Sequence, residues 1–399
     1  MKSRLILLIC LFVSAVSYSQ EKKFDFEVYG WVSPQYYLNS RQCVEGRDGL
    51  LCLYPAAPSI NAYGKDLNAV WNHNFSASMT RIGTRIFMND VLNAKVVGNI
   101  EGDFTGQTDA NIHLLRLRQA NVKMTWSKLA LTFGHGWNVF CVPEMMPTMQ
   151  ELNNGAPFHP FSRVNHIRAD YRIAKSLTLV GSLGWQRDYA SIGVDGGRDY
   201  RQLNRSMLPE LNFQIQFRQN GLLAGLTGEM KTLKPILEYE ETVTSFAANA
   251  FVNYRTKNWD FRLQAVYGEN LNDYCMLGGY QQDVDFANIG NPYSYIPTLT
   301  STIWFEVSYL GNQRITPAFF AAYAEHSKSD KLGLVNCGSG MHIDRVYRIA
   351  PRIDFNFTKD FFLSAIAEYT NAHYLTDKMD ESVGNWRLGI TLMYKFSNK

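Results

Sequence analysis

Polar and apolar residues alternate with a period of two along most of the chain. Between Leu211 and Arg218, for example, the two kinds of residue take turns at every position. Such alternation is typical of β-strands that have one polar and one apolar face. Sixteen segments of this kind occur, and we expect strands near residues 24–38, 75–89, 94–104, 113–126, 129–137, 164–172, 177–187, 208–218, 222–231, 243–255, 259–269, 298–310, 314–326, 345–357, 361–370 and 385–396.

The connections between these segments alternate in length. Seven are tight turns, around residues 90–93, 127–128, 173–176, 219–221, 256–258, 311–313 and 358–360. The other eight are long, and the longest lie near 39–74, 138–163 and 270–297. Short turns at one end and long loops at the other are typical of outer-membrane barrels, and a bilayer accepts strands only when the sheet closes.

We therefore predict an all-β protein, a transmembrane antiparallel β-barrel of 16 strands with long extracellular loops and short periplasmic turns. The alternative is a soluble β-sandwich or propeller. Its outer face should be polar, and its loops should have similar lengths at both ends.

Residues 1–19 have the pattern of a secretory signal peptide. Two basic residues precede an apolar core from Leu5 to Val16, and small residues follow at the expected cleavage site. This core is too short to span a bilayer as a helix, which needs about 18 consecutive apolar residues. We expect residues 20–399 to form a single barrel domain in the outer membrane of a Gram-negative cell, in contact with its lipid.

The composition agrees with a membrane barrel, and the net charge argues against nucleic-acid binding. Aromatic residues make up 14% of the chain, and several, such as Trp126, Trp259 and Tyr394, fall next to tight turns, where barrels carry aromatic girdles. The mean hydropathy is only −0.21, as expected when half of the strand positions face water. The net charge of +3 falls to +1 once the two basic residues of the signal are removed, so no overall basic field for nucleic acid exists.

A barrel of 16 strands encloses an aqueous lumen, and the short stretch before the first strand leaves no room for a plug. We therefore predict a passive channel, a porin, rather than an energised transporter. Arginines on the polar phase of the strands favour anions, and we expect them to line the pore: Arg81, Arg85, Arg116, Arg118, Arg168, Arg172, Arg348 and Arg352. Other charged residues face them: Lys95, Glu101, Asp103, Asp170, Glu229, Asp260 and Asp354. The alternative for each arginine is that it pairs with an acid to satisfy buried charge.

The long loop at residues 138–163 is the candidate constriction. Four prolines restrict its path, and Glu144 and Glu151 supply charge. The alternative is an outward surface loop whose methionines pack on the rim.

Two cysteines in the first long loop, Cys43 and Cys52, are nine positions apart, and we expect a disulfide between them, since export permits it. The same loop supports a second hypothesis about function. A non-conducting surface or adhesin barrel would use this loop, with exposed Tyr54, Pro55 and Pro58, to bind a partner.

Catalytic motifs are missing from the sequence. The histidines are dispersed, and no HExxH, GxSxG, P-loop or CxxC pattern occurs. We therefore expect no enzyme activity, no cofactor and no metal site.

Four consecutive pieces between residues 81 and 140 carry a specific resemblance. They are RIGTRIF, GNIEGDFTG, HLLRLRQANVKMTW and LALTFGHGWNVF. In order and spacing they resemble the N-terminal strands of the DcaP-like porins, trimeric outer-membrane channels of Gram-negative bacteria. The resemblance implies a homotrimer that admits small, preferentially anionic solutes such as dicarboxylates. The charged pore positions of the family correspond most closely to Glu101, Asp103, Arg116 and Arg118.

Overall fold

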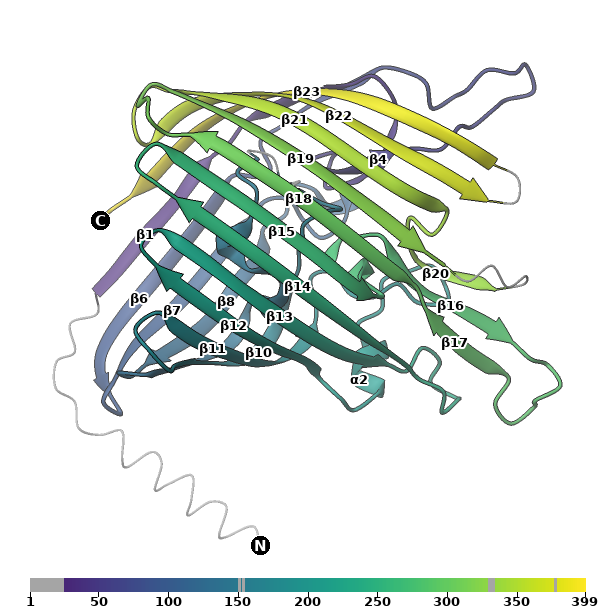
Figure 1. Ribbon diagram of the computed structural model, residues 1–399, viewed down its shortest axis with the longest axis horizontal. Coiled ribbons are helices and arrows are strands. Elements are labelled where there is room, and N and C mark those ends of the chain that lie inside the picture. Colours follow the sequence, from purple (N-terminus) through teal and green to yellow (C-terminus); the bar gives the residue numbers. More distant parts are fainter. Residues whose placement is uncertain (1–24, 150–151, 153–154, 329–333, 377–378) are drawn as a thin grey trace, which may run out of the picture.

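The computed structural model describes residues 25–149, 152, 155–328, 334–376 and 379–399 and shows a closed antiparallel β-barrel of 16 strands (Figure 1). The expected signal peptide, residues 1–19, lies outside the described residues. The wall consists of β1 (Asp25–Val32), β2 (Gln35–Asn39), β5 (Asn72–Ser76), β6 (Arg81–Val91), β7 (Ala94–Asp103), β8 (Arg116–Thr125), β9 (Leu129–Trp137), β10 (Arg163–Arg172), β11 (Leu177–Gln186), β12 (Glu210–Gln219), β13 (Leu222–Leu233), β14 (Val243–Arg255), β15 (Trp259–Glu269), β18 (Leu299–Tyr309), β19 (Ile315–Ser327), β21 (Ile343–Asn356), β22 (Phe361–Thr376) and β23 (Met379–Ser397). Wall strands pair antiparallel with their neighbours, and β23 closes the sheet against β1 and β2.

Two wall strands are interrupted at the same height, so that the 18 wall segments form 16 strands. Pro34, which has no backbone N–H, follows Ser33 between β1 and β2. A turn closed by the Thr80 N–H and the Ala77 carbonyl separates β5 from β6. The Ser33 N–H donates to Thr80 Oγ1 at 3.3 Å, which joins the two interruptions.

The strands turn their polar residues inward and their apolar residues outward, as in a membrane barrel. On β12, the polar residues Glu210, Asn212 and Gln214 point inward and are buried. The apolar residues between them point outward, and Leu211 and Phe213 are 40% and 59% exposed. A soluble sheet would bury its apolar side, so the exposed apolar face indicates contact with lipid.

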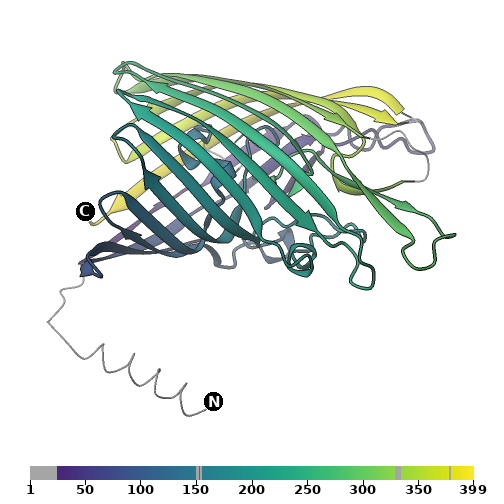
Figure 2. The ribbon, with the colours of Figure 1, turned by 60° about the horizontal axis from the view of Figure 1, so that its bottom comes forward.

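Tight turns lie at the end of the barrel that also holds the C-terminus, and long loops extend from the opposite end (Figure 1, Figure 2). The turn between β12 and β13 illustrates why such turns are short. Asn220 and Gly221 have φ angles of 50° and 81°, which suit the twist of a two-residue hairpin.

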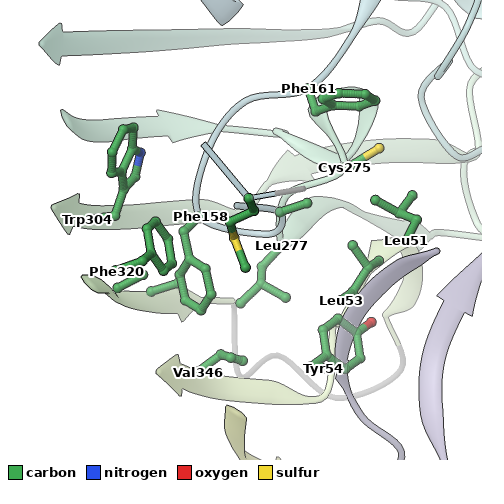
Figure 3. Close-up of a cluster of buried hydrophobic side chains, with 14 of the residues drawn as sticks. Leu51, Leu53, Tyr54, Phe158, Phe161, Cys275, Leu277, Trp304, Phe320 and Val346 are labelled. Atoms are coloured by element: carbon green, nitrogen blue, oxygen red, sulfur yellow. The ribbon is translucent and has the colours of Figure 1, made fainter. Parts of the chain in front are cut away.

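Much of the lumen is filled by segments of the long loops. The long loops contain β3 (Cys43–Gly46), β4 (Leu51–Pro55), η1 (Asp109–Asn111), η2 (Val139–Cys141), η3 (Pro143–Met145), α2 (Arg201–Arg205), η4 (Asn272–Tyr274), β16 (Gly278–Val284), β17 (Tyr293–Pro297) and β20 (Val335–Ser339). The paired strands β16 and β17 project beyond the rim of the barrel (Figure 1). Leu51, Phe158 and Leu277, from three different loops, pack in one hydrophobic cluster with Trp304 of the wall strand β18 (Figure 3). No helix in the described ranges has the length and apolarity to cross a membrane.

Candidate functional site: the barrel lumen

The loop at residues 138–162 folds back into the barrel and is held by side chains of the inner wall. Thr302 Oγ1 on β18 donates a hydrogen bond to the Phe158 carbonyl at 3.0 Å. The His159 ring is fully buried, and its Nδ1 lies 2.6 Å from Gln264 Oε1 on β15. The loop therefore occupies space that would otherwise belong to the pore.

The structure describes only one of the two acids predicted to line the constriction. Glu144 is half exposed, and Arg218 on β12 donates a hydrogen bond to its carboxylate at 3.1 Å. Glu151 lies outside the described residues. Met145 and Met149 are buried in the internal hydrophobic cluster and do not pack on the rim.

The first long loop also turns inward, which corrects one expectation. Tyr54 is only 4% exposed, Pro55 is buried and Pro58 is partly buried. Tyr374 Oη on β22 donates a hydrogen bond to the Pro55 carbonyl at 2.7 Å. The expectation of an exposed binding surface at these residues is wrong, because β4 is apolar and packs against the other inward loops.

Cys43 and Cys52 are free cysteines in this structure, and the disulfide between them stays a prediction. They lie on the paired strands β3 and β4, but the register places Cys43 opposite Pro55 and Cys52 opposite Glu45. The thiols still interact, and hydrogen bonding to Cys52 raises the pKa of Cys43. The other free cysteines are buried: Cys141, Cys275 and Cys337.

Five predicted residues meet on the inner face of β6, β7 and β8. Arg116 Nη2 lies 2.8 Å from Asp103 Oδ2. Arg118 contacts Glu101 Oε1 at 2.9 Å and Asp103 Oδ2 at 2.8 Å, and Arg81 Nη1 lies 3.4 Å from Glu101 Oε1. All but Arg81 are nearly inaccessible, so the network fits the alternative in which arginines satisfy buried charge.

Two charged residues in this cluster were not identified from the sequence. The Arg163 guanidinium pairs with Asp188 and lies over the Trp137 ring, 4.7 Å from its centroid. Burial alone would raise the Asp188 pKa, but the guanidinium groups of Arg163 and Arg116 hold it below its ordinary value. Asp188 follows β11 in a loop, where alternation gives no indication of which way a side chain points.

A second set of lumen-facing residues on β6 to β10 is accessible to water. Arg85 is 45% exposed and pairs with Glu27 at 3.0 Å, whereas Arg168 is partly exposed and pairs with Asp170 at 2.6 Å. Three further cations on this inner surface are exposed: Lys95, Lys123 and Arg172. Lys123 was not singled out from the sequence, because an irregularity between Leu117 and Gln119 shifts the alternation of β8 by one residue and turns Lys123 to the inner face.

The last two predicted arginines lie on β21, away from these groups. Arg352 Nε lies 3.3 Å from Asp354 Oδ1, and Arg348 Nε lies 3.1 Å from Glu368 Oε1. Arg348 is fully buried beneath the inward loops. The predicted arginines therefore form several separate groups, and their role in selectivity stays a prediction.

Several solved structures share this fold. The outer-membrane channel DcaP of Acinetobacter baumannii superimposes with a TM-score of 0.72 at 17% identity, covering 95% of this chain and 99% of that one. An anion-selective porin from Comamonas acidovorans gives 0.58 at 10% identity over 94% of this chain and 100% of that one. A loop-deletion mutant of OmpT, an outer-membrane protein of Vibrio cholerae, gives 0.55 at 10% identity over 94% and 99%.

No protein-family model and no curated protein sequence matches the chain. At these identities the likeness concerns the fold, which is that of outer-membrane porins and channels. The resemblance to the DcaP-like porins that residues 81–140 indicated is confirmed at this level.

Proposed function

We propose that the protein is an outer-membrane porin, a water-filled channel for the passive diffusion of small hydrophilic solutes. The apolar outer face, the polar inner face and the fold of known outer-membrane channels support this function. The observation that carries it is the exposure of Arg85 on the lumen face of β6. A guanidinium inside a membrane barrel reaches water only when the lumen itself is wet.

The channel prefers anions in this proposal. The acids Glu101 and Asp103 are buried beneath their arginine partners, and Glu27 and Asp170 pair with Arg85 and Arg168. Beyond these pairs, three exposed cations lie on the inner faces of β7, β8 and β10: Lys95, Lys123 and Arg172. Basic side chains that line a pore attract anions and repel cations. The similar fold of a porin described as anion-selective agrees with this preference.

Reversal potentials in a salt gradient test the preference. We expect the wild-type channel to be anion-selective. Replacing the exposed cations together, in the variant K95Q/K123Q/R172Q, should shift the reversal potential toward zero. Lys359→Gln is the matched control, because Lys359 lies in a tight turn and is 91% exposed outside the lumen. Cation selectivity of the wild type, or an equal shift in the control, would refute the assignment.

The channel acts as a homotrimer in the outer membrane in this proposal. Support comes from the likeness to DcaP, and from a trimer form of Vibrio cholerae OmpT that superimposes with a TM-score of 0.52 at 9% identity. Native mass spectrometry of the detergent-solubilised protein should give three chains per particle. A monomer at all detergent concentrations would contradict it.

A further inference from the structure

Three carboxylates meet inside the barrel, two from the wall strands β12 and β13 and one from a loop. Glu210 is the first residue of β12, Glu229 lies on β13, and Asp273 belongs to η4 in the inward loop at residues 270–298. One oxygen from each lies within 4.8 Å of the others. The three side chains come from distant parts of the sequence, so no motif in the sequence predicts the cluster.

Lys231 compensates only part of this charge. Its Nζ lies 2.5 Å from Asp273 Oδ1 and 3.3 Å from Glu229 Oε1. Three ionised carboxylates and one ammonium leave two negative charges, and all four side chains are buried. Uncompensated buried charge is costly, so further positive charge or protons must enter the cluster.

Neutral hydrogen-bond donors surround the carboxylates without removing that charge. Asn138 Nδ2 donates to Glu210 Oε2 at 3.1 Å, and Gln186 Nε2 donates to Asp273 Oδ2 at 3.1 Å. Tyr274 Oη donates to Glu229. These contacts fix the orientation of the acids and leave Glu210 Oε1 without a hydrogen-bond partner among the described residues.

A second observation points to a missing ligand. Within the described part of the chain, both polar atoms of the Asn212 amide, Ser245 Oγ and Glu210 Oε1 are buried without a hydrogen-bond partner. Asn212 is 5% exposed, lies directly opposite Glu229 in the strand pairing and shares the inner face of β12 with Glu210. Buried polar atoms rarely lack partners, and here they adjoin the charged cluster.

We propose that this cluster binds a divalent cation, with Ca²⁺ as the preferred ion. Its ligands are the carboxylates of Glu210, Glu229 and Asp273 and the amide oxygen of Asn212. An all-oxygen set without histidine or cysteine selects hard cations, and an irregular set from three elements suits the flexible coordination of Ca²⁺ better than the octahedron of Mg²⁺. A divalent ion also supplies two positive charges, which balance the two negative charges that remain after Lys231 is counted.

The ion has a structural consequence for the lumen. Asp273 belongs to one inward loop, and Glu210 accepts a hydrogen bond from Asn138 at the start of another. A cation shared by Asp273 and Glu210 therefore fastens both loops to β12 and β13. The site does not depend on whether the barrel conducts, so its failure and the failure of the proposed function are distinguishable.

Terbium luminescence tests the site directly in the folded protein after treatment with a chelator. Tb³⁺ replaces Ca²⁺ at oxygen sites, and the Tyr274 ring, whose hydroxyl contacts Glu229, is placed to sensitise its emission. We expect saturable emission that Ca²⁺ displaces. Glu210→Gln and Asp273→Asn should each weaken binding by at least about tenfold, since each removes a charged ligand. Glu325→Gln is the matched control, because Glu325 is an exposed carboxylate near the extracellular end of β19.

Asn212→Ala keeps every charge in place and serves where a carboxylate variant does not fold. It should also weaken binding, while added Ca²⁺ should raise the thermal unfolding midpoint of the wild type more than that of the variant. Absence of saturable, Ca²⁺-displaceable emission in the folded wild type would overturn the proposal, and so would unchanged affinity in the folded site variants. Protons would then be the compensating charge.

Discussion

The guanidinium of Arg348 connects segments that are far apart in the sequence. It donates hydrogen bonds to the Ala156 carbonyl at 2.7 Å and to the Leu53 carbonyl at 2.9 Å, which belong to two inward loops. Its Nε also contacts Thr370 Oγ1 at 2.8 Å and pairs with Glu368 on the neighbouring strand β22. Every direction of the guanidinium is thus used for structure, and Arg348 offers no free face to a solute.

Arg348→Ala should therefore destabilise the protein strongly. The change leaves the Glu368 carboxylate buried without its counter-charge, and breaking a buried ion pair in this way costs about 3–5 kcal/mol. Denaturant unfolding in detergent measures the free energy of unfolding. Arg172→Ala is the control, because Arg172 is exposed on the lumen face and its loss should change stability by no more than about 0.5 kcal/mol. Equal stability of the two variants would contradict this structural role of Arg348.

At the scale of elements, the loop at residues 138–162 combines apolar packing with a few buried polar groups. His159 packs against the Trp304 ring at 5.7 Å between centroids and contacts Gln264 on the wall. Burial lowers the pKa of His159 to about 4, and nearby Arg262 adds to this effect, whereas the hydrogen bond to Gln264 opposes it. The loop therefore holds a neutral imidazole against the wall.

Acidification should loosen this loop. Between the ordinary pKa of 6.5 and about 4, the unfolded chain binds a proton at His159 that the folded chain does not. The contribution of neutral His159 is therefore complete above pH 6.5 and falls as the pH drops toward 4, by about 3 kcal/mol in total. Comparison of the unfolding free energy at pH 7 and pH 4.5 should show a smaller decrease in His159→Gln than in the wild type. The same decrease in both proteins would argue against the assignment.

Alternation predicts the wall well because one face of every strand meets lipid and the other meets polar side chains. It locates the ends of the last hairpin less well. β22 and β23 reach Thr376 and start at Met379, whereas the expected segments end at 370 and begin at 385. On the inner face of this extension Ala372, Tyr374 and Val383 are buried in the hydrophobic cluster, so the inner face there is apolar and differs from the rest of the wall. The loop strands β3, β4 and β16 were not predicted, since packing from several sides leaves no regular alternation of polar and apolar residues.

The same limit applies to the site. Arg172 and Arg348 occupy equivalent positions in their alternating strands, yet one is exposed and the other is fully buried. The difference arises from the loops that fold over Arg348, which come from elsewhere in the chain. The alternation of polar and apolar residues therefore identifies the inner face of a strand. It does not indicate which charged residues on that face are exposed to water.

At the scale of the whole molecule, the side chains next to the tight turns agree with a bilayer boundary. Trp259 packs with Tyr309 at 4.9 Å between ring centroids, and Phe361 packs with Tyr394 at 6.3 Å. Trp259 and Tyr394 are about half exposed on the outer surface. Amphipathic rings favour the interface between lipid and water, so these residues mark the end of the barrel that we assign to the periplasm.

Single-channel recording tests the central claim most directly. Purified wild-type protein, shown to be folded by its β-sheet circular dichroism, is added to planar bilayers in salt solution without any energy source or ligand. A water-filled passive channel predicts stable, stepwise increases in current that scale with the voltage. Insertion of folded protein without any conductance steps would contradict the account and favour a barrel whose loops close the lumen.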